Sequence, residues 1–427
     1  MRIAIIAFGS RGDVQPHIAL GTRLHAAGHD VRIITHAVFE TQVRHLGLYF
    51  FPAVGDPQAI VAAESGQDWL GSGNNSLLFF QRFTRIAEPL IQQAMLDCWQ
   101  GCQDVEAIVC SPLAICTAPS IAEKLDIPYW IGAGQPLTPT TAFASPFFPV
   151  TPLPFSWFSS RYNQLTHTLS ARIFWRLIGP IVNTARHAVL HLPPLSGNWL
   201  YENLARQRFR ILYYYSPAVL PQPSDWQHNN HVTGYWFLDD KTEWQPSARL
   251  LDFLAAGPAP VYVGFGSMQT RNPGHMTEIV LKALQISGQR GILLTGGGGL
   301  SQNDSQNDLP DEVFQIEFAP HDWLFPRMAA VVHHGGAGTM AASLRAGVPS
   351  IMIPFFGDQP FWGRRFFEMG IISEPIPRKR LTAERLATAI NVAVNDIDLR
   401  SRVVALSARI RAEDGLEKAV SILQQQP

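Results

Sequence analysis

The sequence predicts an α/β protein of two domains that each contain a parallel sheet and face one another across a cleft. Short apolar segments alternate with amphipathic helical segments through the first half of the chain, and the same alternation restarts after residue 230. Continuous apolar strands separated by helices are typical of a parallel sheet that is covered on both sides. The chain of 427 residues is also too long for one ordinary domain.

The first domain is expected at residues 1–220 and carries apolar segments with the length of strands. A helix is expected after the first of them, because Leu20 and Leu24 lie on one face and Gly28 closes the segment. The expected strands are 2–8, 30–36, 105–112, 127–133 and 209–217.

The second domain is expected at residues 232–400, after a linker at 221–231 that is rich in proline and polar residues. It repeats the order of strand, loop and helix, which again favours a parallel sheet. The expected strands are 260–267, 291–297, 314–320, 329–334 and 349–355.

Composition argues against several classes of protein. The formal net charge is −1, so the overall balance of charge attracts neither nucleic acid nor an anionic membrane. No apolar run is long enough to span a membrane, and the four cysteines contain no C-x-x-C pair, which favours reduced, packed thiols. We therefore expect a soluble, cytoplasmic protein without a nucleic-acid partner.

The segment 330–339 reads AVVHHGGAGT and holds the densest set of candidate binding residues. It places His333 at the carboxyl end of an expected strand, with Gly335 and Gly336 in the turn before a helix. Accessible backbone and the positive end of a helix dipole suit phosphate oxygens, to which an imidazole adds a hydrogen bond. Neighbouring residues on a strand point to opposite faces, so His333 and His334 are not expected to share one metal. An anion site is predicted, and a purely structural strand end is the alternative.

A dinucleotide site stays open on the motif alone. Gly336-x-Gly338-x-x-Ala341 fits the dinucleotide-binding fingerprint, and Asp358 follows about 20 residues later, as that fingerprint requires. An NAD-dependent oxidoreductase is therefore one alternative. In FGDQPFWGRR, however, Asp358 stands beside Gln359, and an acid next to an amide suits several hydroxyls of one sugar.

The stretch HHGGAGTMAASLRAGVPSIMIPFFGDQPFWGRR resembles the signature of the nucleotide-sugar-dependent glycosyltransferases that include sterol 3-beta-glucosyltransferases and glycopeptide-antibiotic enzymes. FGSRGDVQPHIALG, VTGYW and VGFGSM are similar to further landmarks of that family, in the same order along the chain. The resemblance implies the GT-B fold, in which two Rossmann-like domains face across a cleft and the C-terminal domain holds most of the donor nucleotide. It also implies that residues 401–427 form a C-terminal helix that crosses back to the first domain.

The resemblance gives roles to individual residues. His333 would touch the donor diphosphate, assisted by the turn that follows it and by Ser267 of the GFGS turn. Asp358 and Gln359 would bind the sugar hydroxyls. The nucleotide base would lie against FAPHDWL, although Phe318 fits the core equally well. The implied donor-binding residues are Ser267, Phe318, Ala319, His321, His333, Gly336, Ala337, Gly338, Thr339, Asp358 and Gln359.

The loop GSRGD carries the candidate catalytic residue. Asp13 lies at the start of the first helix, where an aspartate usually acts as the N-cap. The resemblance favours a general base instead, since sterol and glycopeptide members carry Asp where plant flavonoid members carry His. The helix N-terminus should keep this carboxylate ionised and intrinsically weak as a base. His17, expected on the helix surface one turn later, is the second candidate.

The sequence departs from the plant pattern of the family at two positions. The strand end that would carry a supporting Asp reads CSPLA, which gives Asp13 no carboxylate partner there. The position of a ribose-binding Glu is Ala341, so ribose recognition must come from elsewhere. The pair Asp396-x-Asp398 is the sole Asp-x-Asp match, and it falls in a helical region where a solvated surface is expected. The family pattern thus favours a metal-independent reaction in which His333 and helix amides meet the leaving-group charge.

The expected reaction is inverting transfer of a hexose, with UDP-glucose as the favoured donor and a dTDP-sugar as the alternative. The aromatic-rich stretch 143–158 and Phe79–Phe80 indicate a hydrophobic acceptor such as a sterol, another lipid or a polyketide. Residues 136–160 are rich in proline and phenylalanine and suit an irregular lip, which leaves a transient contact with a membrane surface open. A non-catalytic sugar-nucleotide-binding protein is the remaining alternative. His333 weighs against it, because such relatives generally lack that histidine.

Overall fold

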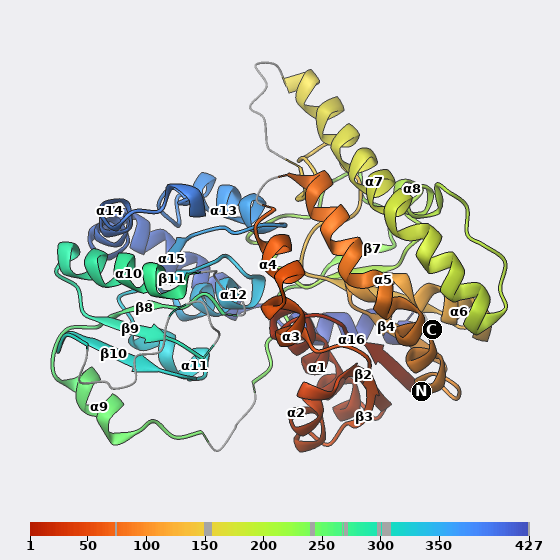
Figure 1. The fold of residues 1–427 in the computed structure, drawn as a ribbon, viewed down its shortest axis with the longest axis horizontal. Helices are drawn as coiled ribbons and strands as arrows, with labels where there is room; N and C mark the ends of the chain where they lie inside the picture. Colours follow the sequence, from red (N-terminus) through yellow and green to blue (C-terminus); the bar gives the residue numbers. More distant parts are fainter. Residues whose placement is uncertain are drawn as a thin grey trace. The chain divides into compact units, whose positions relative to one another are not determined.

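The computed structural model describes residues 1–72, 75–148, 156–239, 244–266, 268, 272–296, 300 and 309–425 (Figure 1). The chain divides into two compact units. Unit 1 contains residues 1–239 together with 413–427, and unit 2 contains residues 240–412. Each unit has its own sheet of parallel strands with helices between them, which confirms the expected α/β fold class.

The sheet of unit 1 has the spatial order β3-β2-β1-β4-β5-β6-β7, and its strands are parallel. The chain starts at β1, builds outward to β3, and then returns to the other side of β1 with β4. This reversal is the switch point of doubly wound folds. The strands are β1 (Arg2–Ile6), β2 (Asp30–His36), β3 (Tyr49–Ala53), β4 (Ala107–Cys110), β5 (Tyr129–Ala133), β6 (Ile211–Tyr213) and β7 (Asn230–Val232).

The helices of unit 1 bury one apolar face each against the sheet or against one another. α1 inserts Val14 and Ile18 into the core, and α16, from the end of the chain, adds Val420 and Leu423 to the same cluster. None of the helices in the described ranges is long and apolar enough to cross a membrane. The helices are α1 (Arg11–Ala26), α2 (Glu40–His45), α3 (Pro57–Ala62), α4 (Glu64–Leu70), α5 (Ser76–Gly101), α6 (Ala118–Leu125), α7 (Ser156–Leu190), α8 (Trp199–Ala205) and α16 (Gly415–Gln425).

Two strands of this sheet are not among the expected ones. β3 contains Pro52, which weakens its strand pattern but is tolerated because β3 lies at the edge of the sheet. β7 overlaps the segment 221–231, which we expected to be a linker. Trp226 in that segment is buried and stacks on Tyr213 with ring centroids 4.6 Å apart, so the segment packs as part of unit 1.

The sheet of unit 2 has the order β10-β9-β8-β11-β12, again parallel, with its switch point between β8 and β11. The strands are β8 (Val261–Val263), β9 (Gly291–Leu294), β10 (Val313–Ile316), β11 (Ala330–His333) and β12 (Ser350–Met352). The helices are α9 (Ala248–Ala255), α10 (Pro273–Ser287), α11 (His321–Leu324), α12 (Ala337–Ala346), α13 (Gln359–Glu368), α14 (Ala383–Asn395) and α15 (Ile397–Arg411).

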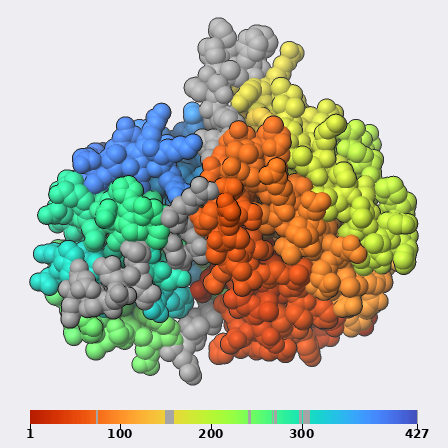
Figure 2. All heavy atoms as spheres, viewed as in Figure 1, coloured from red at the N-terminus to blue at the C-terminus, as the bar shows by residue number. Residues whose placement is uncertain are grey.

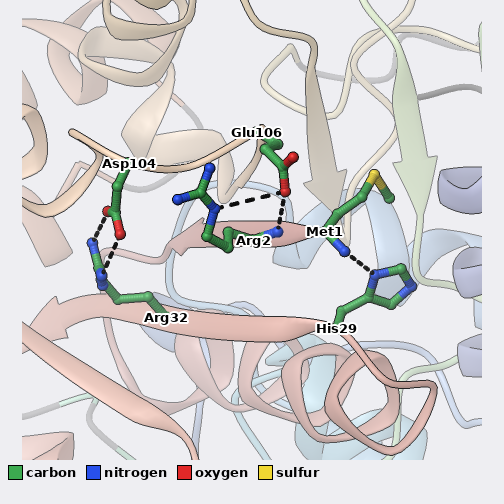
Figure 3. Close-up of polar contacts among 6 residues, drawn as sticks. All are labelled: Met1, Arg2, His29, Arg32, Asp104 and Glu106. Carbon is green, nitrogen blue, oxygen red and sulfur yellow. Dashed lines mark hydrogen bonds and ion pairs between the residues drawn. The ribbon is translucent and has the colours of Figure 1, made fainter.

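The amino-terminal edge of the unit 1 sheet is closed by surface ion pairs (Figure 3). Arg2 donates its backbone N–H to Glu106 at 2.7 Å, and the Arg32 guanidinium lies 2.8 Å from the carboxylate of Asp104. Exposed pairs of this kind contribute roughly 0–1 kcal/mol each to stability. They fasten the starts of β1 and β2 to the segment before β4, and ligand chemistry is therefore expected at the opposite, carboxyl edge.

The four cysteines of unit 1 are buried free thiols, as the sequence indicated. Burial raises the pKa of Cys102 and of Cys116 to about 12, so both remain protonated at neutral pH. A protonated, buried thiol is a poor nucleophile, and these residues act as packing groups.

Candidate active site

The candidate residues of each unit follow the carboxyl ends of strands, and His333 and Asp13 lie beside the switch points of their sheets. In unit 2 the turn after β11 begins at His334 and leads into α12. In unit 1 the loop after β1 leads into α1 and carries Asp13. Loops at a switch point diverge to opposite faces of a sheet and leave room for a ligand between them.

His333 ends β11 with a side chain that is 0% exposed. Its Nδ1 accepts a hydrogen bond from the backbone N–H of Gly335 at 3.0 Å, so in the neutral ring the proton sits on Nε2. That Nε2–H is buried and has no hydrogen-bond partner among the described residues. An unsatisfied buried donor costs about 1–3 kcal/mol, which a ligand acceptor would recover.

Burial also fixes the charge of this histidine. Desolvation keeps the pKa of His333 well below its ordinary value, and the neighbouring His334 and His321 lower that pKa further. The side chain therefore acts as a neutral hydrogen-bond donor at physiological pH, not as an imidazolium.

Glycines form the N-terminus of α12, so no side chain of the N-cap residue caps this helix. Gly335 has φ of +95°, a conformation that other residues rarely adopt, and Gly336 is the N-cap without a side chain to bind the first helical N–H groups. A Cβ added at Gly338 would meet no described heavy atom within 4 Å. The start of α12 thus presents backbone N–H groups and the positive end of a helix dipole to whatever approaches Gly338.

His334 serves a different purpose from His333, as the alternation along a strand predicts. Its ring packs against glycines: a Cβ at Gly336 would lie 2.4 Å from its Nε2, and one at Gly266 would lie 3.3 Å from its Cε1. The rings of His333 and His334 are nearly perpendicular, with centroids 6.4 Å apart. Burial lowers the pKa of His334 to about 4, so it too is neutral.

Asp358 and Gln359 open α13 and are placed differently. The carboxylate of Asp358, which is half-buried, accepts a hydrogen bond from Trp362 Nε1 at 3.2 Å. Gln359 is 6% exposed, and its Oε1 accepts hydrogen bonds from the backbone N–H of Phe355 at 2.8 Å and of Phe356 at 3.4 Å. The amide oxygen of Gln359 is thus engaged by its own turn. Its NH2 group donates one hydrogen to Met268 Sδ at 3.9 Å, and its second hydrogen could serve a ligand.

The segment expected at the nucleotide base splits into a core part and a surface part. Phe318 is 46% exposed, so the alternative that it belongs to the core is wrong. Ala319 is buried, so its side chain offers no surface to a ligand. His321 is half-buried and stacks on Phe325 with centroids 4.3 Å apart. Ser267 lies outside the described residues.

In unit 1 the Asp13 carboxylate accepts hydrogen bonds from the N-cap residue of its own helix. Ser10 is the N-cap, and both its backbone N–H and its Oγ donate to Asp13 Oδ2 at 2.9 Å. Asp13 therefore occupies the third helical position, not the N-cap position. The spacing Ser10-x-x-Asp13 is a helix-start pattern, and this spacing in the sequence is the signal that predicts the contact.

Burial changes the expected basicity of Asp13. Desolvation raises the pKa of Asp13 above its ordinary value and outweighs the lowering effect of the Ser10 hydrogen bonds. The expectation that the helix N-terminus makes this carboxylate a weak base is therefore wrong. A raised pKa brings a carboxylate closer to the range in which a general base works near neutral pH.

The second candidate base, His17, lies in the core and not on the helix surface. It is 0% exposed, its Nδ1 donates to the backbone oxygen of Asp13 at 2.8 Å, and its ring meets Tyr214 and Trp236 edge-on. Burial lowers its pKa to about 4.

The strand end after β4, where plant flavonoid members of the family carry a supporting Asp, has Ser111 instead. Its Oγ accepts a hydrogen bond from the backbone N–H of Phe8 at 3.0 Å.

Groups suited to a metal are not found among the described residues: no three or more His, Cys, Asp or Glu side chains converge there. Asp396 is exposed and caps α15, where its Oδ1 accepts the backbone N–H of Leu399 at 2.9 Å. Asp398 is also exposed, which confirms the solvated setting expected for this pair.

Comparison with known proteins defines the class. Residues 3–143 match the glycosyltransferase family 28 N-terminal domain, and residues 299–423 match the erythromycin biosynthesis protein CIII-like C-terminal domain. The fold is similar to that of the kitacinnamycin glycotransferase, with a TM-score of 0.70 and 18% identity over 100% of this chain and 98% of that one. It is similar to VinC in complex with dTDP, with a TM-score of 0.68 and 19% identity over 100% and 99% of the two chains. These are glycosyltransferases of two Rossmann-like domains.

Curated relatives narrow the class to a family. The chain is 36% identical over 426 residues to a sterol 3-beta-glucosyltransferase of Arabidopsis thaliana, covering 98% of this chain and 67% of that protein. It is 37% identical over 431 residues to a sterol 3-beta-glucosyltransferase of Emericella nidulans, covering 99% of this chain and 30% of that protein. The chain belongs to the family of nucleotide-sugar-dependent glycosyltransferases that contains these enzymes. This assignment confirms the resemblance and removes the oxidoreductase alternative.

The relatives are longer proteins than this chain. The chain spans 64% of a second Arabidopsis relative and about 30% of the fungal one. Donor, acceptor and residue roles are therefore argued below from the site itself.

Proposed function

We propose that this glycosyltransferase moves glucose from UDP-glucose to the hydroxyl of a sterol or another hydrophobic acceptor, with inversion at the anomeric carbon and without a bound metal. The observation that carries the proposal is the buried Nε2–H of His333, which has no partner among the described residues and lies beside the N-terminus of α12, where glycine is the N-cap. A neutral donor and a helix dipole together suit a diphosphate. The names of the relatives favour glucose and a sterol.

The donor is assigned to unit 2. His333 Nε2 donates to a diphosphate oxygen, and the N–H groups at Ala337, Gly338 and Thr339 complete the contact. Phe318, with nearly half of its surface exposed, offers a face to the uracil ring, while the backbone of Ala319 and the ring of His321 border it. Ser267 keeps its proposed contact with the phosphates.

The sugar is assigned to the start of α13. The Asp358 carboxylate is half-buried and oriented by Trp362, which suits a bond from a sugar hydroxyl. The Gln359 amide contributes through its NH2 group, since its oxygen already holds the turn. A carboxylate with a fixed orientation discriminates between hydroxyl positions better than a mobile one.

The chemical step uses Asp13 as general base. Its carboxylate takes the proton of the acceptor hydroxyl as that oxygen forms a bond to the anomeric carbon, and the bond from this carbon to the diphosphate oxygen breaks. The nucleoside diphosphate leaves with the electron pair, and His333 together with the α12 amides stabilises its charge. One displacement inverts the anomeric centre, so an α-linked donor yields a β-linked product.

The acceptor is assigned to aromatic side chains of unit 1. The ring centroids of Phe79 and Phe80 on α5 lie 5.9 Å and 5.7 Å from the ring centroid of Phe147. The ring centroids of Phe80 and of Phe174 on α7 are 5.4 Å apart. Trp69 joins this cluster through Phe79 at 5.5 Å. Apart from Phe80, these rings are only half-buried, so they offer apolar surface to a flat, hydrophobic acceptor.

Peripheral contact with a membrane surface is part of the same proposal, because a sterol acceptor resides in a bilayer. Of the expected lip, residues 149–155 lie outside the described ranges. α7 follows that lip in the sequence and runs beside α5 (Figure 1), and the surfaces of the two segments adjoin in Figure 2. The segment 127–201 contains no Asp or Glu. Exposed residues recur on α7 at helical spacing: Arg161, Leu165, Leu169, Arg172 and Arg176. Arginines around exposed leucines suit anionic lipid. The cytoplasmic location stays a prediction.

Vesicle flotation tests this contact. Leu165 is 54% exposed, and Leu165→Glu should reduce binding to vesicles that contain phosphatidylglycerol. Leu251→Glu, at a leucine of α9 that is 46% exposed in unit 2, is the matched control and should bind like the parent. Equal binding of both variants would remove α7 from the contact.

The function itself is tested by an acceptor screen with radiolabelled UDP-glucose over sterols, polyketides and phenols, with and without EDTA. We expect a β-glucoside of a sterol, formed at the same rate in EDTA. UDP binding without any glycoside would instead support a non-catalytic nucleotide-sugar-binding protein, and loss of product in EDTA would contradict the metal-independent step.

A further inference from the structure

A histidine of the neighbouring strand β2, His36, binds the loop that carries Asp13. No sequence motif marked this histidine as a functional residue. His36 is the last residue of β2 and is 6% exposed. Its Nε2 accepts a hydrogen bond from the backbone N–H of Gly9 at 3.2 Å, and its ring lies 5.5 Å from that of Phe8. The side chain thus reaches across the carboxyl edge of the sheet to the loop after β1.

The second nitrogen of this ring fixes its tautomer. His36 Nδ1 lies 3.1 Å from the backbone oxygen of Val54, an atom that only accepts hydrogen bonds, so Nδ1 carries the proton. Nε2 then has a lone pair, as its bond from Gly9 requires. The neutral Nδ1–H form is therefore the form that holds both neighbours at once.

Gly9 connects this histidine to the carboxylate. Its φ of +119° is a conformation that favours glycine, and a Cβ added there would lie 2.5 Å from Asp13 Oδ2. The next residue, Ser10, donates both its backbone N–H and its Oγ to that same oxygen. The placement of Gly9 therefore decides where the Asp13 carboxylate lies.

The other end of the chain of contacts rests on α5. The backbone N–H of Val54 donates to Asp97 Oδ2 at 2.8 Å, and Gln93 Nε2 donates to Asp97 Oδ1 at 2.7 Å. Gly55 leaves little room on this side, since a Cβ there would lie 3.3 Å from His36 Cε1. His36 is thus held between a fixed acceptor and the loop that it supports.

We propose that His36 is a positioning residue for catalysis: its neutral imidazole holds the Gly9 N–H and so keeps the Asp13 carboxylate in the orientation that accepts the proton. The inference rests on the proposed role of Asp13 and deepens it. A small displacement of a catalytic group costs up to about 100-fold in rate, which sets the scale of the effect.

Protonation of His36 would abolish the contact, because Nε2 would then carry a hydrogen and could no longer accept one from the Gly9 N–H. Burial lowers the pKa of His36, while the backbone oxygens at Val54 and Gly55 and the charge of Asp56 raise it in part. The other carboxylates along its contacts are Asp13 on α1 and Asp97 on α5. The contact is present above this lowered pKa and is lost as the pH falls through it.

Two amide replacements separate the two bonds of the imidazole. A glutamine places its amide group near the Nε2 position and can accept from Gly9. An asparagine places its amide near the Nδ1 position and can donate only to Val54. We expect His36→Asn to lower kcat by about 10- to 100-fold with an unchanged KM for UDP-glucose, and His36→Gln to stay within about threefold of the parent.

A buried hydrogen bond one residue earlier provides the control. Thr35 Oγ1 donates to the backbone oxygen of Ala7 at 2.6 Å but does not contact Gly9. Thr35→Val should lose stability and keep kcat. If His36 had only a structural role, His36→Asn would also lose stability and keep its kcat, as Thr35→Val does. That result would overturn the proposal.

Hydrogen–deuterium exchange provides a readout that needs no acceptor. In His36→Asn the amides of the loop over residues 8–13 should exchange faster than in the parent, whereas His36→Gln should match the parent. Unchanged exchange in His36→Asn would overturn the proposal even if Asp13 is the base.

The double variant separates the two hypotheses. If His36 acts through Asp13, adding His36→Asn to Asp13→Asn should lower the residual rate by less than about twofold, since coupled residues are not additive. A full additional loss would contradict positioning through Asp13. If Asp13→Asn alone left turnover unchanged, the base assignment would fail instead.

Discussion

A helix N-terminus lies at the switch point of each sheet, and the two N-termini are capped differently. In unit 1 the start of α1 is closed by the protein itself, because the Asp13 carboxylate accepts both donors of Ser10. In unit 2 the start of α12 has only Gly336 as its N-cap. The difference teaches which unit does what. A helix that already holds a carboxylate repels a second anion and keeps a base, whereas a helix finished by glycine can receive the anion from a ligand.

The histidines beside these two starts repeat the contrast. Both His36 and His333 are buried and neutral, yet each uses its nitrogens differently. His36 uses both nitrogens on protein backbone, at Gly9 and Val54. His333 uses Nδ1 on Gly335 and has no partner for Nε2 in the part of the chain that the structure describes. One histidine supports a loop, and the other offers a donor to a ligand.

The largest effect is expected from removing the base. Asp13→Asn preserves the shape of the side chain and can still accept from Ser10, so UDP affinity measured by calorimetry should stay within a few-fold. The kcat should fall by about 10²- to 10⁴-fold, the usual contribution of a general base. Normal turnover in this variant would mean that unit 1 does not supply the base through α1.

The next largest effect is expected from removing the donor. His333→Ala should weaken UDP binding by about 1.5–3 kcal/mol, the range for a hydrogen bond to a charged group, which corresponds to about 10- to 150-fold in Kd. His275→Ala is the matched control, since that histidine of α10 is exposed and should leave Kd unchanged. Equal affinities in the two variants would leave the buried Nε2–H without a ligand.

A smaller effect is expected from filling the space at the start of α12. Gly338→Ala adds a methyl group where no described atom lies within 4 Å, so the fold should gain up to about 1 kcal/mol from helix propensity. UDP affinity should fall by about tenfold, because the methyl group lies where the diphosphate approaches the helix amides. A variant that gains stability and keeps its affinity would place the diphosphate elsewhere.

The smallest effect concerns stability and pH. Burial raises the pKa of Asp13 in the folded state above its unfolded value, so the folded state binds the proton more tightly. The protonated carboxyl of Asp13 therefore contributes to the free energy of unfolding at low pH. This contribution is lost as the pH rises through the pKa of the folded state. Asp13→Asn should therefore unfold at a temperature equal to or above that of the parent at pH 7, and the difference should narrow on acidification. A lower melting temperature at pH 7 would contradict the burial effect.

The fold could be predicted from the sequence because its central strands are apolar on both faces. RIAII in β1 and AVVH in β11 have that pattern, and each lies inside its sheet with a paired strand on both sides. β3 escaped prediction because Pro52 interrupts it at an edge. β7 escaped because its neighbourhood is polar in sequence, although Trp226 anchors it through a ring contact with Tyr213 that sequence does not reveal.

The candidate site was less predictable, for two physical reasons. Burial decides basicity, and no local pattern shows that Asp13 is desolvated strongly enough to raise its pKa. Contacts between distant segments decide roles: the bond from Gly9 to His36 and the bond from Phe355 to Gln359 depend on how neighbouring loops meet. His333 was accessible to prediction, because the strand, the glycine turn and the helix that create its environment follow one another in sequence.

The crystal structure of the protein with UDP tests the account most directly. We expect the diphosphate within about 3 Å of His333 Nε2 and of the backbone N–H groups at Gly338 and Thr339, the usual distance of an N–H···O bond. A diphosphate bound away from α12, or one bridged to the protein by a divalent cation, would contradict the central claim that a neutral imidazole and a helix N-terminus stabilise the leaving group.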